Sequence, residues 1–561
     1  MREHTIADDR WMSPRRRAIV IGLDSAAFDV LKPWMDRGYL PTISRLVRNG
    51  ASGKLTSTLP PHTAPAWSSF MTGKNPGKHG IFGLMTMSKH HERLQLVSST
   101  DRKAQDLWEI LSDNGRKVVL VNVPLTYPVR RVNGVLVSGF MTPPSAPDYG
   151  YPESVIEELR VKCGDFKPNV DRSTFSEKDP EASVLNAIEQ GLNPLARTVS
   201  YLLSSHEWDF FMFVIQGTDE IQHRLWHLMD PNHPRYSRDE ASRYERTILR
   251  YYQRVDEVLS ETLSKIDRET IIVLVSDHGT RPVDKWISIN MILWKNRLLF
   301  FKRDPVTQLK LLLFRIGVTP INLYRLVLSF QLDQLRRSIK KEETRSILRP
   351  FLISLRDVDW SRTKVYSLGG WGQVYVNAEA VPSSEYEEIR QKAIHTLLDS
   401  TDPATGEHFF ASDGIYLSEQ IYHGPLLDKG PDILALTTPP YQGYPDYEFG
   451  FNKTVVSARG ISGTHAMDGI LVIAGPEIKK HISLTKTSIM DIAPTILYLM
   501  GTDIPEDMDG VVVAAAIEDS YLSSRPPKYK TGMVTEKQAA HEYTIDEQER
   551  LKRMLKDLGY L

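Results

Sequence analysis

The sequence predicts an α/β fold built on a doubly wound, mostly parallel sheet. Short, continuous apolar runs recur along the chain, and such runs are typical of strands buried on both faces of a parallel sheet. Segments with helical spacing of apolar residues lie between them, at residues 103–114, 236–266 and 487–500. Alternation of strands with helices favours a sheet covered by helices on both sides. The apolar runs occupy residues 18–23, 117–122, 209–215, 270–276 and 469–474.

Size and charge restrict the class of protein. At 561 residues the chain is longer than one hydrophobic core supports, so we expect more than one structural unit. The 69 Lys and Arg residues nearly cancel the 70 Asp and Glu residues, so no global field selects a nucleic acid polymer or an anionic membrane. A small phosphorylated substrate stays compatible with this balance, because bound metal ions supply charge locally.

Cysteine content and the absence of long apolar runs indicate the compartment. The single cysteine, Cys163, excludes an intrachain disulfide framework and a cysteine cage for zinc. The segment before residue 18 ends in three consecutive arginines, Arg15, Arg16 and Arg17, and no apolar run of signal-peptide length follows them. No window reaches the roughly 18 apolar residues that a spanning helix needs. We therefore expect a cytoplasmic protein.

Two regions interrupt the alternation of strands and helices. Residues 291–365 read as basic amphipathic helices, which we interpret as an inserted helical cap; a helical layer packed on the sheet is an equal alternative, and contact with a membrane surface is a weaker one. Residues 521–561 read as a C-terminal tail with a short helix at 544–558. The α/β core is then expected to comprise residues 1–290 and 366–520.

Polar residues follow the predicted strands at the edge where α/β sheets bind ligands. Asp24 comes directly after the first strand, where it could equally cap a helix. Thr63 lies in a proline-rich loop that leads into a helix, so its hydroxyl is expected near a helix N-terminus, a position that favours anions. Taken alone, each of these residues is a weak signal.

Three further segments bring imidazole and carboxylate groups to the same edge. Asp219 and His223 follow a strand at a spacing of four, which places both on one helical face. His227 continues this stripe and could neighbour a ligand or contact a phosphate, but we expect it to be simply an exposed residue. The last two segments are Asp277-His278-Gly279, directly after the most apolar strand, and His465 in a loop before another strand.

Together these segments predict a metal centre. Each donor alone has an ordinary structural explanation, but five separate segments deliver them to strand ends. Three aspartates and three histidines without cysteine suit paired Zn²⁺ or a similar first-row ion better than Ca²⁺ or Mg²⁺, and Mn²⁺ is an alternative to zinc. The full set comprises Asp24, Thr63, Asp219, His223, Asp277, His278 and His465.

The order of these motifs resembles the type I phosphodiesterase/nucleotide pyrophosphatase family of the alkaline phosphatase superfamily. The resemblance also covers Thr63-Ala-Pro65, the Ser69 to Ile81 segment and residues 491–495, and it extends over residues 18–512. It implies an alkaline phosphatase-like core and two metal sites. Asp219, His223 and His465 would hold one ion, and Asp24, Asp277 and His278 the other. Thr63 would attack the phosphoryl group and form a covalent phosphothreonine.

Three departures from the family pattern bear on the substrate. Leu84, preceded by Phe82 and Gly83, stands where nucleotide-cleaving members carry an asparagine that holds a phosphoryl oxygen. Ser25 replaces the glycine usual after the first aspartate and is a second candidate nucleophile, although the loop around Thr63 matches the family better. The Cys/Ser-x-Pro-x-Arg signature of sulfatases is absent from the Thr63 segment.

The leading hypothesis is a hydrolase of phosphate diesters or pyrophosphates. A phosphomonoesterase or a phosphoryl transferase could use the same site, and a non-catalytic metalloprotein scaffold is an alternative of another class. Aromatic walls from Trp67, Trp226 and Trp371 would suit a flat leaving group, although tryptophans are equally common in cores.

Overall fold

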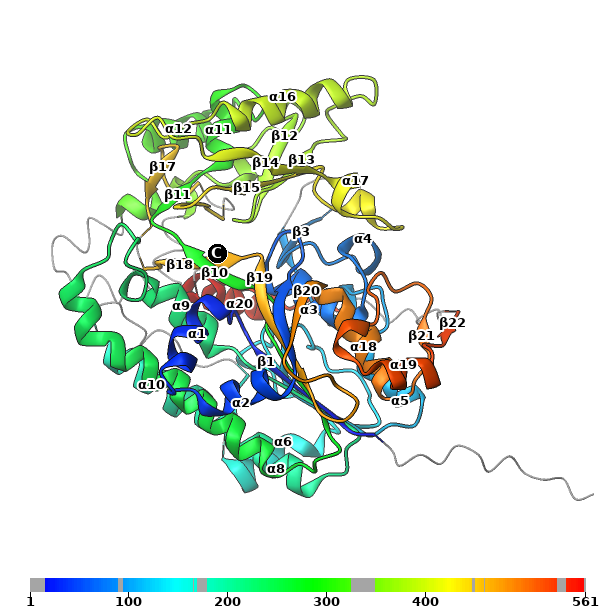
Figure 1. The fold of residues 1–561 in the computed structure, drawn as a ribbon. Coiled ribbons are helices and arrows are strands. Elements are labelled where there is room, and N and C mark those ends of the chain that lie inside the picture. Colours follow the sequence, from blue (N-terminus) through cyan, green and yellow to red (C-terminus); the bar gives the residue numbers. More distant parts are fainter. Residues whose placement is uncertain are drawn as a thin grey trace, which may run out of the picture.

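A nine-stranded sheet forms the centre of the larger of two lobes in this computed structural model (Figure 1). The structure describes residues 16–88, 94–164, 166–168, 179–323, 349–445, 449–458, 460–531 and 541–558. The strand order is β20-β2-β19-β9-β1-β8-β5-β6-β7. The strands are β1 (Ala18–Leu23), β2 (Ala51–Thr56), β5 (Val118–Val123), β6 (Gly134–Ser138), β7 (Gly150–Tyr151), β8 (Phe210–Ile215), β9 (Ile271–Val275), β19 (Asp468–Ala474) and β20 (Ile482–Ser488).

The sheet is mostly parallel, as predicted. Strand β1 pairs in parallel with both β8 and β9, and β5 pairs in parallel with β6 and β8. Strand β19 runs antiparallel to β2 and β9, and β7 runs antiparallel to β6. All five predicted apolar runs form strands of this sheet, within a residue or two of the expected bounds.

Helices cover both faces of the sheet, which confirms the doubly wound α/β class. Side chains alternate along β1: Ile19 and Ile21 belong to one core cluster and Val20 to the other. The first face is covered by α1 (Phe28–Asp36), α2 (Pro41–Asn49), α6 (Ser154–Cys163), α7 (Pro180–Asn186), α8 (Asn193–Ser205), α9 (Gly217–Leu225) and α10 (Arg238–Leu263). The second is covered by α3 (Thr63–Thr72), α5 (Leu107–Asp113) and α18 (Ile492–Leu499).

The smaller lobe is an excursion of the chain between two strands of the larger one. Strands β10 (Gly279–Pro282) and β18 (Gly463–Ala466) pair antiparallel and form the ribbon through which the chain leaves and returns (Figure 1). The lobe contains a four-stranded antiparallel sheet in the order β12-β13-β15-β14. Its strands are β12 (Val365–Leu368), β13 (Gln373–Val376), β14 (Phe410–Leu417) and β15 (Ile433–Thr437), and β11 (Lys285–Ile287), β16 (Tyr441–Gly443) and β17 (Val455–Ser457) form a second small sheet.

Helices and strands share one hydrophobic core in this lobe. The helices are α11 (Ile289–Lys295), α12 (Pro305–Arg315) and α16 (Tyr386–Leu398). Their apolar residues pack with those of β12, β13 and β15. The lobe includes a sheet whose strands fall almost entirely within residues 366–520, which we expect to belong to the main core. The lobe thus reaches beyond the segment 291–365 that we interpret as a helical cap. Residues 324–348 of that segment lie outside the described residues, and the division at residues 290, 365 and 520 stays a prediction.

The C-terminal region packs back onto the larger lobe. Helix α19 (Asp519–Ser524) follows the sheet, and α20 (Ile545–Leu558) lies where a short helix was predicted. Tyr543, Leu551 and Leu555 are buried in a cluster with Ala64 and Leu84, next to the predicted nucleophile. None of the described helices combines the length and the hydropathy that crossing a bilayer requires.

Candidate metal centre and its cleft

The first donor cluster lies where two neighbouring parallel strands end. Asp24 follows β1 and Asp277 lies just beyond the end of β9, so sheet register places both carboxylates at the same edge. His278 comes next in the chain, and its Nε2 lies 3.2 Å from Asp277 Oδ2 and 3.6 Å from Asp24 Oδ1. All three side chains are at most 2% exposed. Their ligand atoms lie within 4.8 Å of one another, close enough to share one metal ion.

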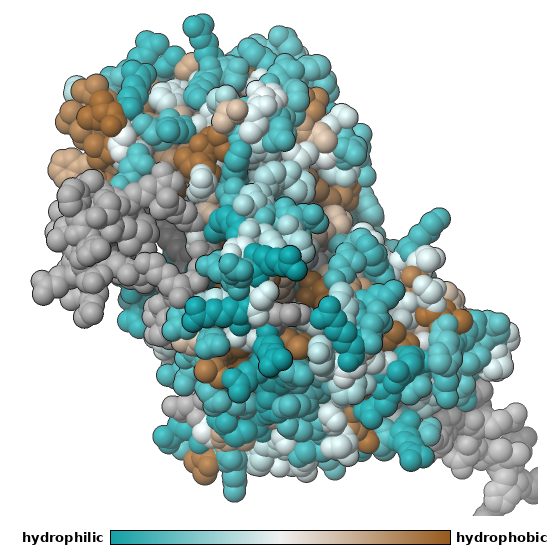
Figure 2. All heavy atoms as spheres, turned by 60° about the vertical axis from the view of Figure 1, so that its left-hand side comes forward, coloured by the Kyte–Doolittle hydropathy of each residue, from teal (hydrophilic) through white to brown (hydrophobic). Residues whose placement is uncertain are grey.

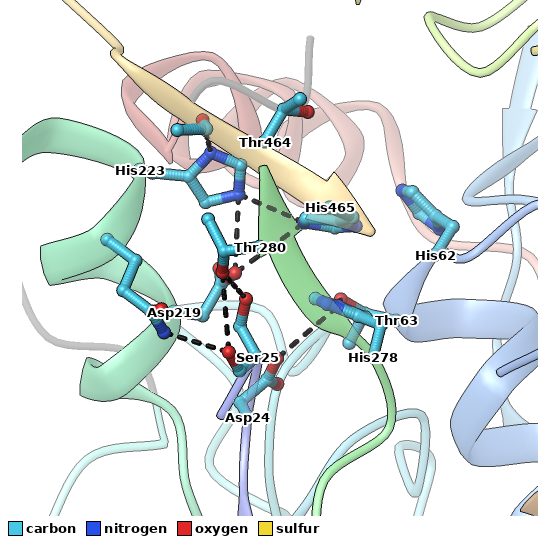
Figure 3. A network of polar contacts seen from close by, with 12 residues as sticks. Asp24, Ser25, His62, Thr63, Asp219, His223, His278, Thr280, Thr464 and His465 are labelled. Atoms are coloured by element: carbon cyan, nitrogen blue, oxygen red, sulfur yellow. Dashed lines mark hydrogen bonds and ion pairs between the residues drawn. The ribbon is translucent and has the colours of Figure 1, made fainter. Parts of the chain in front are cut away.

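The second cluster joins a helix of the larger lobe to the ribbon between the lobes. Asp219 and His223 share one face of α9, as their spacing predicted, and His465 is carried by β18. Asp219 Oδ1 lies 3.3 Å from His223 Nε2 and 3.6 Å from His465 Nε2. The rings of His278 and His465 are stacked 3.7 Å apart, so the two clusters are adjacent (Figure 3). The structure thus brings together the six predicted donors other than Thr63.

The orientation of the three histidines fits metal binding. His223 Nδ1 lies 2.8 Å from Gly463 O, His465 Nδ1 lies 3.0 Å from Pro61 O, and His278 Nδ1 lies 3.1 Å from Gly279 O. A carbonyl only accepts, so each Nδ1 carries the proton and each Nε2 presents a lone pair to the centre. His223 Nε2 and His465 Nε2 face each other at 2.9 Å, which is repulsive for two lone pairs unless a cation lies beside them. Histidine ligands of metals are held in this way by a hydrogen bond at the other nitrogen.

The carboxylates also fit a site that binds positive charge. Burial, followed by the neighbouring charges of Asp277 and Asp219, raises the pKa of Asp24 well above its usual value. Burial also raises the pKa of Asp277. Asp24 Oδ1 and Asp277 Oδ2 are buried and accept no hydrogen bond from the described residues. Burial and the adjacent histidines lower the pKa of His465 well below its usual value, which keeps this ring neutral and able to bind a metal.

Thr63 lies at the first residue of α3, beside the first cluster. His62 precedes the helix as its N-cap, with Nδ1 accepting a long hydrogen bond (3.4 Å) from the backbone N–H of Ala64. The Thr63 hydroxyl lies 3.3 Å from His278 Nε2. The helix N-terminus at this point offers backbone N–H groups to the oxygens of a phosphoryl group. Burial lowers the pKa of His62 to about 3, so this side chain is neutral.

Ser25, the second candidate nucleophile, has a backbone conformation that explains the usual glycine. Its φ is +63°, in the left-handed region that glycine adopts at low cost. The Ser25 hydroxyl lies 2.6 Å from Thr280 Oγ1 and 3.2 Å from Gly279 O. The hydroxyl is thus engaged in a hydrogen-bond network with β10.

A cleft opens between the lobes beside His62, next to Thr63; the empty space within it and at its open mouth is about 350 Å³. One wall comes from the larger lobe and carries Leu84, the residue in place of the expected asparagine. The opposite wall comes from the β12–β13 hairpin. The lining residues are His62, Phe82, Gly83, Leu84, Met85, Leu368, Gly369, Trp371, Gln373 and Tyr375. None of them carries an ionised side chain near neutral pH, since His62 is neutral.

Trp371 connects this cleft with the second cluster. Its ring stacks on His465 at 4.3 Å and meets His62 edge-on at 5.0 Å. Of the three tryptophans considered as walls, Trp67 is fully buried in the sheet core and Trp226 packs away from the cleft, with Nε1 donating to Asp230. The stacking of Trp371 is not predictable from the sequence, because only the fold brings the smaller lobe to His465.

The prediction that His227 is exposed was wrong. Helix α9 ends at Leu225, and a short 3-10 helix (Trp226–Leu228) turns the chain. This turn directs His227 inward, where Nδ1 lies 3.0 Å from Ser462 Oγ in the loop before β18. Burial lowers the pKa of His227 to about 4. His227 therefore supports the loop that carries His465.

Solved protein structures are similar to this chain, and one of them, phosphonoacetate hydrolase, supports its fold. Phosphonoacetate hydrolase from Sinorhizobium meliloti 1021, solved with phosphonoformate, is 16% identical, with a TM-score of 0.52 over 87% of this chain and 96% of that chain. Human ectonucleotide pyrophosphatase/phosphodiesterase 5 is 12% identical, with a TM-score of 0.46 over 87% of this chain and 95% of that chain. No curated protein sequence matches the chain.

The sequence itself identifies the family. Residues 18–446, well over half of the chain, match the family described as type I phosphodiesterase / nucleotide pyrophosphatase. This match confirms the resemblance that the motifs indicated. The chain belongs to the type I phosphodiesterase / nucleotide pyrophosphatase family, a group of hydrolytic enzymes of the alkaline phosphatase superfamily.

Proposed function

We propose that the chain hydrolyses phosphate diesters through a phosphothreonine formed on Thr63, with two divalent metal ions, Zn²⁺ by preference, bound beside it. The observation that carries this proposal is the convergence of two buried three-donor clusters at the Thr63 hydroxyl. Six donors from four segments of the chain have no other shared structural purpose. The family is metal-dependent, which supports the same interpretation.

Each cluster would hold one ion. Asp24, Asp277 and His278 would bind the ion nearer Thr63, and Asp219, His223 and His465 would bind the other. A mixed set of carboxylates and neutral imidazoles without thiolate suits zinc or manganese. Bound ions of this kind lower the pKa of a hydroxyl group and neutralise charge on the oxygens around phosphorus.

The protein residues supply the nucleophile and its orientation. The Thr63 hydroxyl gives up its proton as Oγ1 attacks phosphorus, and the bond from phosphorus to the leaving oxygen breaks. The leaving oxygen takes up one proton and departs as an alcohol, so no proton is gained or lost overall. The first-turn N–H groups of α3 donate to the phosphoryl oxygens. Water then attacks the phosphothreonine, releases a phosphate monoester and restores the Thr63 hydroxyl.

The cleft favours a diester over a pyrophosphate. A second phosphate in the cleft would need positive side chains, and the lining residues supply none. Phe82, Trp371 and Tyr375 instead offer apolar surface to an uncharged substituent of the phosphate. Leu84 contributes a methyl surface where an amide donor was expected, so phosphoryl oxygens would depend on the helix N-terminus.

The test compares three proteins after metal removal and after return of zinc or manganese. Wild type, Thr63→Ala and the matched control Thr63→Ser are assayed on bis-p-nitrophenyl phosphate and on p-nitrophenyl phosphate. We expect metal-dependent release from the diester, a loss on the order of 10³-fold or more in Thr63→Ala, and partial recovery in Thr63→Ser. Acid quenching followed by peptide mass spectrometry should detect the phosphate on residue 63.

Each other outcome assigns a different function. Activity retained by Thr63→Ala would reject Thr63 as nucleophile and direct attention to Ser25. A faster rate on the monoester would indicate a phosphomonoesterase, and phosphorylation of an added alcohol would indicate a transferase. Two bound zinc ions without turnover of either ester would indicate a metalloprotein scaffold.

A further inference from the structure

Helix α12 of the smaller lobe has one face that packs in the normal way. Asp304 caps its N-terminus by accepting a hydrogen bond from the Thr307 N–H at 3.0 Å. Leu311 and Phe314 are buried in the core of the lobe, and Phe314 contacts Trp294 and Phe449. This inner face accounts for the formation of the helix.

The outward face of α12 is also apolar. At 100° per residue, Leu309, Leu312 and Ile316 lie opposite Leu311 and Phe314. Leu309 is 56% exposed, Leu312 57% and Ile316 71%, and Val306 beside them is 62% exposed. A surface helix normally carries polar residues on its outer side, and a helix that is apolar all round is expected where both sides are covered.

These side chains form a cluster rather than scattered exceptions. Single exposed apolar residues need no explanation, whereas contiguous ones indicate a binding surface. Four of the large hydrophobic side chains exposed on the described residues fall between positions 306 and 316. Figure 2 shows hydrophobic residues gathered at the upper left edge of the smaller lobe. Elsewhere, exposed residues such as Val161 and Val511 stand alone in the sequence.

Exposed basic residues flank α12 at both ends in the sequence, and another, Arg356, contacts one of them. Lys302, Arg303, Arg315 and Arg356 are all exposed. Lys302 Nζ donates to the Arg356 carbonyl at 2.8 Å, which places these two residues together, and the Arg315 guanidinium lies 5.8 Å from the centre of the Trp294 ring. Lys310 is paired with Asp357 at 2.8 Å, so neither adds net charge. Against these four cations stands the exposed carboxylate of Asp304, and the rim is positive although the whole chain is nearly neutral.

We propose that α12 docks the smaller lobe onto an anionic phospholipid surface. A helix lying in the interface would bury Leu309, Leu312 and Ile316 among acyl chains, while Lys302, Arg303 and Arg356 meet phosphate groups. The positive rim selects this partner over a neutral apolar protein surface. The binding is peripheral, and it is independent of the chemistry proposed for Thr63.

The test is cosedimentation of the full chain with vesicles of phosphatidylcholine, with and without phosphatidylserine. We expect binding to the anionic vesicles, weakened by salt. The variant Leu309→Glu/Leu312→Glu should reduce the partition constant roughly tenfold or more, because two apolar side chains no longer enter the interface. Lys302→Glu/Arg303→Glu should lower the partition constant at least as much, but only on the anionic vesicles. Each basic residue near such a surface contributes ~1 kcal/mol to binding. Val161→Glu, an exposed aliphatic residue of α6, is the matched control and should bind like wild type.

Other outcomes overturn the proposal. Equal binding by wild type and Leu309→Glu/Leu312→Glu would place the membrane contact elsewhere. A dimer that this variant dissociates would assign the face to a second copy of the chain. A monomeric protein that stays in the supernatant while either kind of vesicle sediments would reject lipid docking. Unchanged turnover of bis-p-nitrophenyl phosphate and an unchanged melting temperature would show that the variants fold.

Discussion

The two donor clusters are chemically alike but are positioned by different means. Asp24 and Asp277 extend from adjacent central strands, so the hydrogen-bond ladder between β1 and β9 fixes their separation. Asp219, His223 and His465 come from α9 and from the ribbon between the lobes. Their alignment depends on side-chain contacts: the carbonyls of Gly463 and Pro61 and the ring of Trp371.

We call the cluster of Asp24, Asp277 and His278 the rigid cluster. The cluster of Asp219, His223 and His465 is the supported cluster. Sheet register in the interior of a domain is strongly specified, because a slip of one residue would exchange the two buried faces. A cluster assembled across a ribbon keeps its geometry only while its supports stay in place. Substitutions at the strand ends should therefore act directly on charge and metal binding, whereas substitutions in the smaller lobe should act on the second cluster alone.

The largest effect is expected from Asp24→Asn. Activity should fall on the order of 10³-fold or more, because one charged ligand of the rigid cluster is lost. The metal-free variant should nevertheless be more stable than metal-free wild type. The pKa of Asp24 is raised in the folded protein, so the metal-free protein loses stability as the pH rises above the pKa that Asp24 has in the unfolded chain. The asparagine side chain does not ionise, and the variant therefore avoids this loss. Melting temperatures in chelator and in zinc would measure both effects.

Asp219→Asn is the corresponding variant of the supported cluster. Both Asp24→Asn and Asp219→Asn should lose activity. Zinc should stabilise wild type strongly, by ~4 kcal/mol at a thousandfold excess over its dissociation constant, and each variant less. A metal-free Asp24→Asn protein that melts below wild type would contradict the account of mutually repelling carboxylates.

Trp371→Ala should produce the next largest effect. Loss of the stacked ring frees His465 to reorient, and outer supports of metal ligands are worth roughly 10- to 100-fold in affinity. Titration calorimetry should then resolve one weakened ion and one unchanged ion. Trp371→Phe keeps an aromatic face and serves as the control. Equal weakening of both ions would show that the clusters do not differ in the way described.

The rigid cluster is predictable from the sequence because local patterns determine where its carboxylates lie. A run such as residues 18–23 has to be a buried strand, so Asp24 has to lie at a strand end, and the same holds for Asp277. The spacing of Asp219 and His223 likewise fixes one helical face. The α/β class follows from the same periodicity, since it rests on many such runs.

The supports of the second cluster depend on contacts between distant segments. The β12–β13 hairpin is short, and its apolar pattern alone did not separate it from the main core. His227 continued a helical stripe in the sequence, but the helix ended two residues earlier. The sequence shows that Ser25 replaces a glycine but not why glycine is usual there. The φ of +63° at this position supplies the reason.

Arg281→Ala tests a longer connection to Trp371 and should have a smaller effect. Arg281 lies on β10 and donates to the Tyr441 carbonyl at 3.1 Å and to Gln442 Oε1 at 3.0 Å. Gln442 Nε2 in turn donates to the carbonyl of Gly370, next to Trp371. Removal of this anchor should lower kcat/KM by about tenfold while both ions still bind, because several neighbouring contacts still hold the hairpin. Arg281→Lys should recover part of the loss, and a variant at wild-type rate would reject the connection.

The smallest effect is expected on the pH dependence of folding stability, through His227 beside the supported cluster. Burial lowers the pKa of His227 to about 4, so the unfolded chain binds this proton more tightly than the folded one. The resulting stability is present above pH 6.5 and is lost as the pH falls toward 4. A full shift would amount to about 1.4 kcal/mol per pH unit; with partial screening of the ring by solvent we expect on the order of 1 kcal/mol between pH 7.5 and 5.5. Urea denaturation of metal-free wild type and His227→Gln at both pH values should show a steeper decline for wild type. Parallel declines would mean that His227 titrates alike in both states, and that the loop carrying His465 owes nothing to its neutral ring.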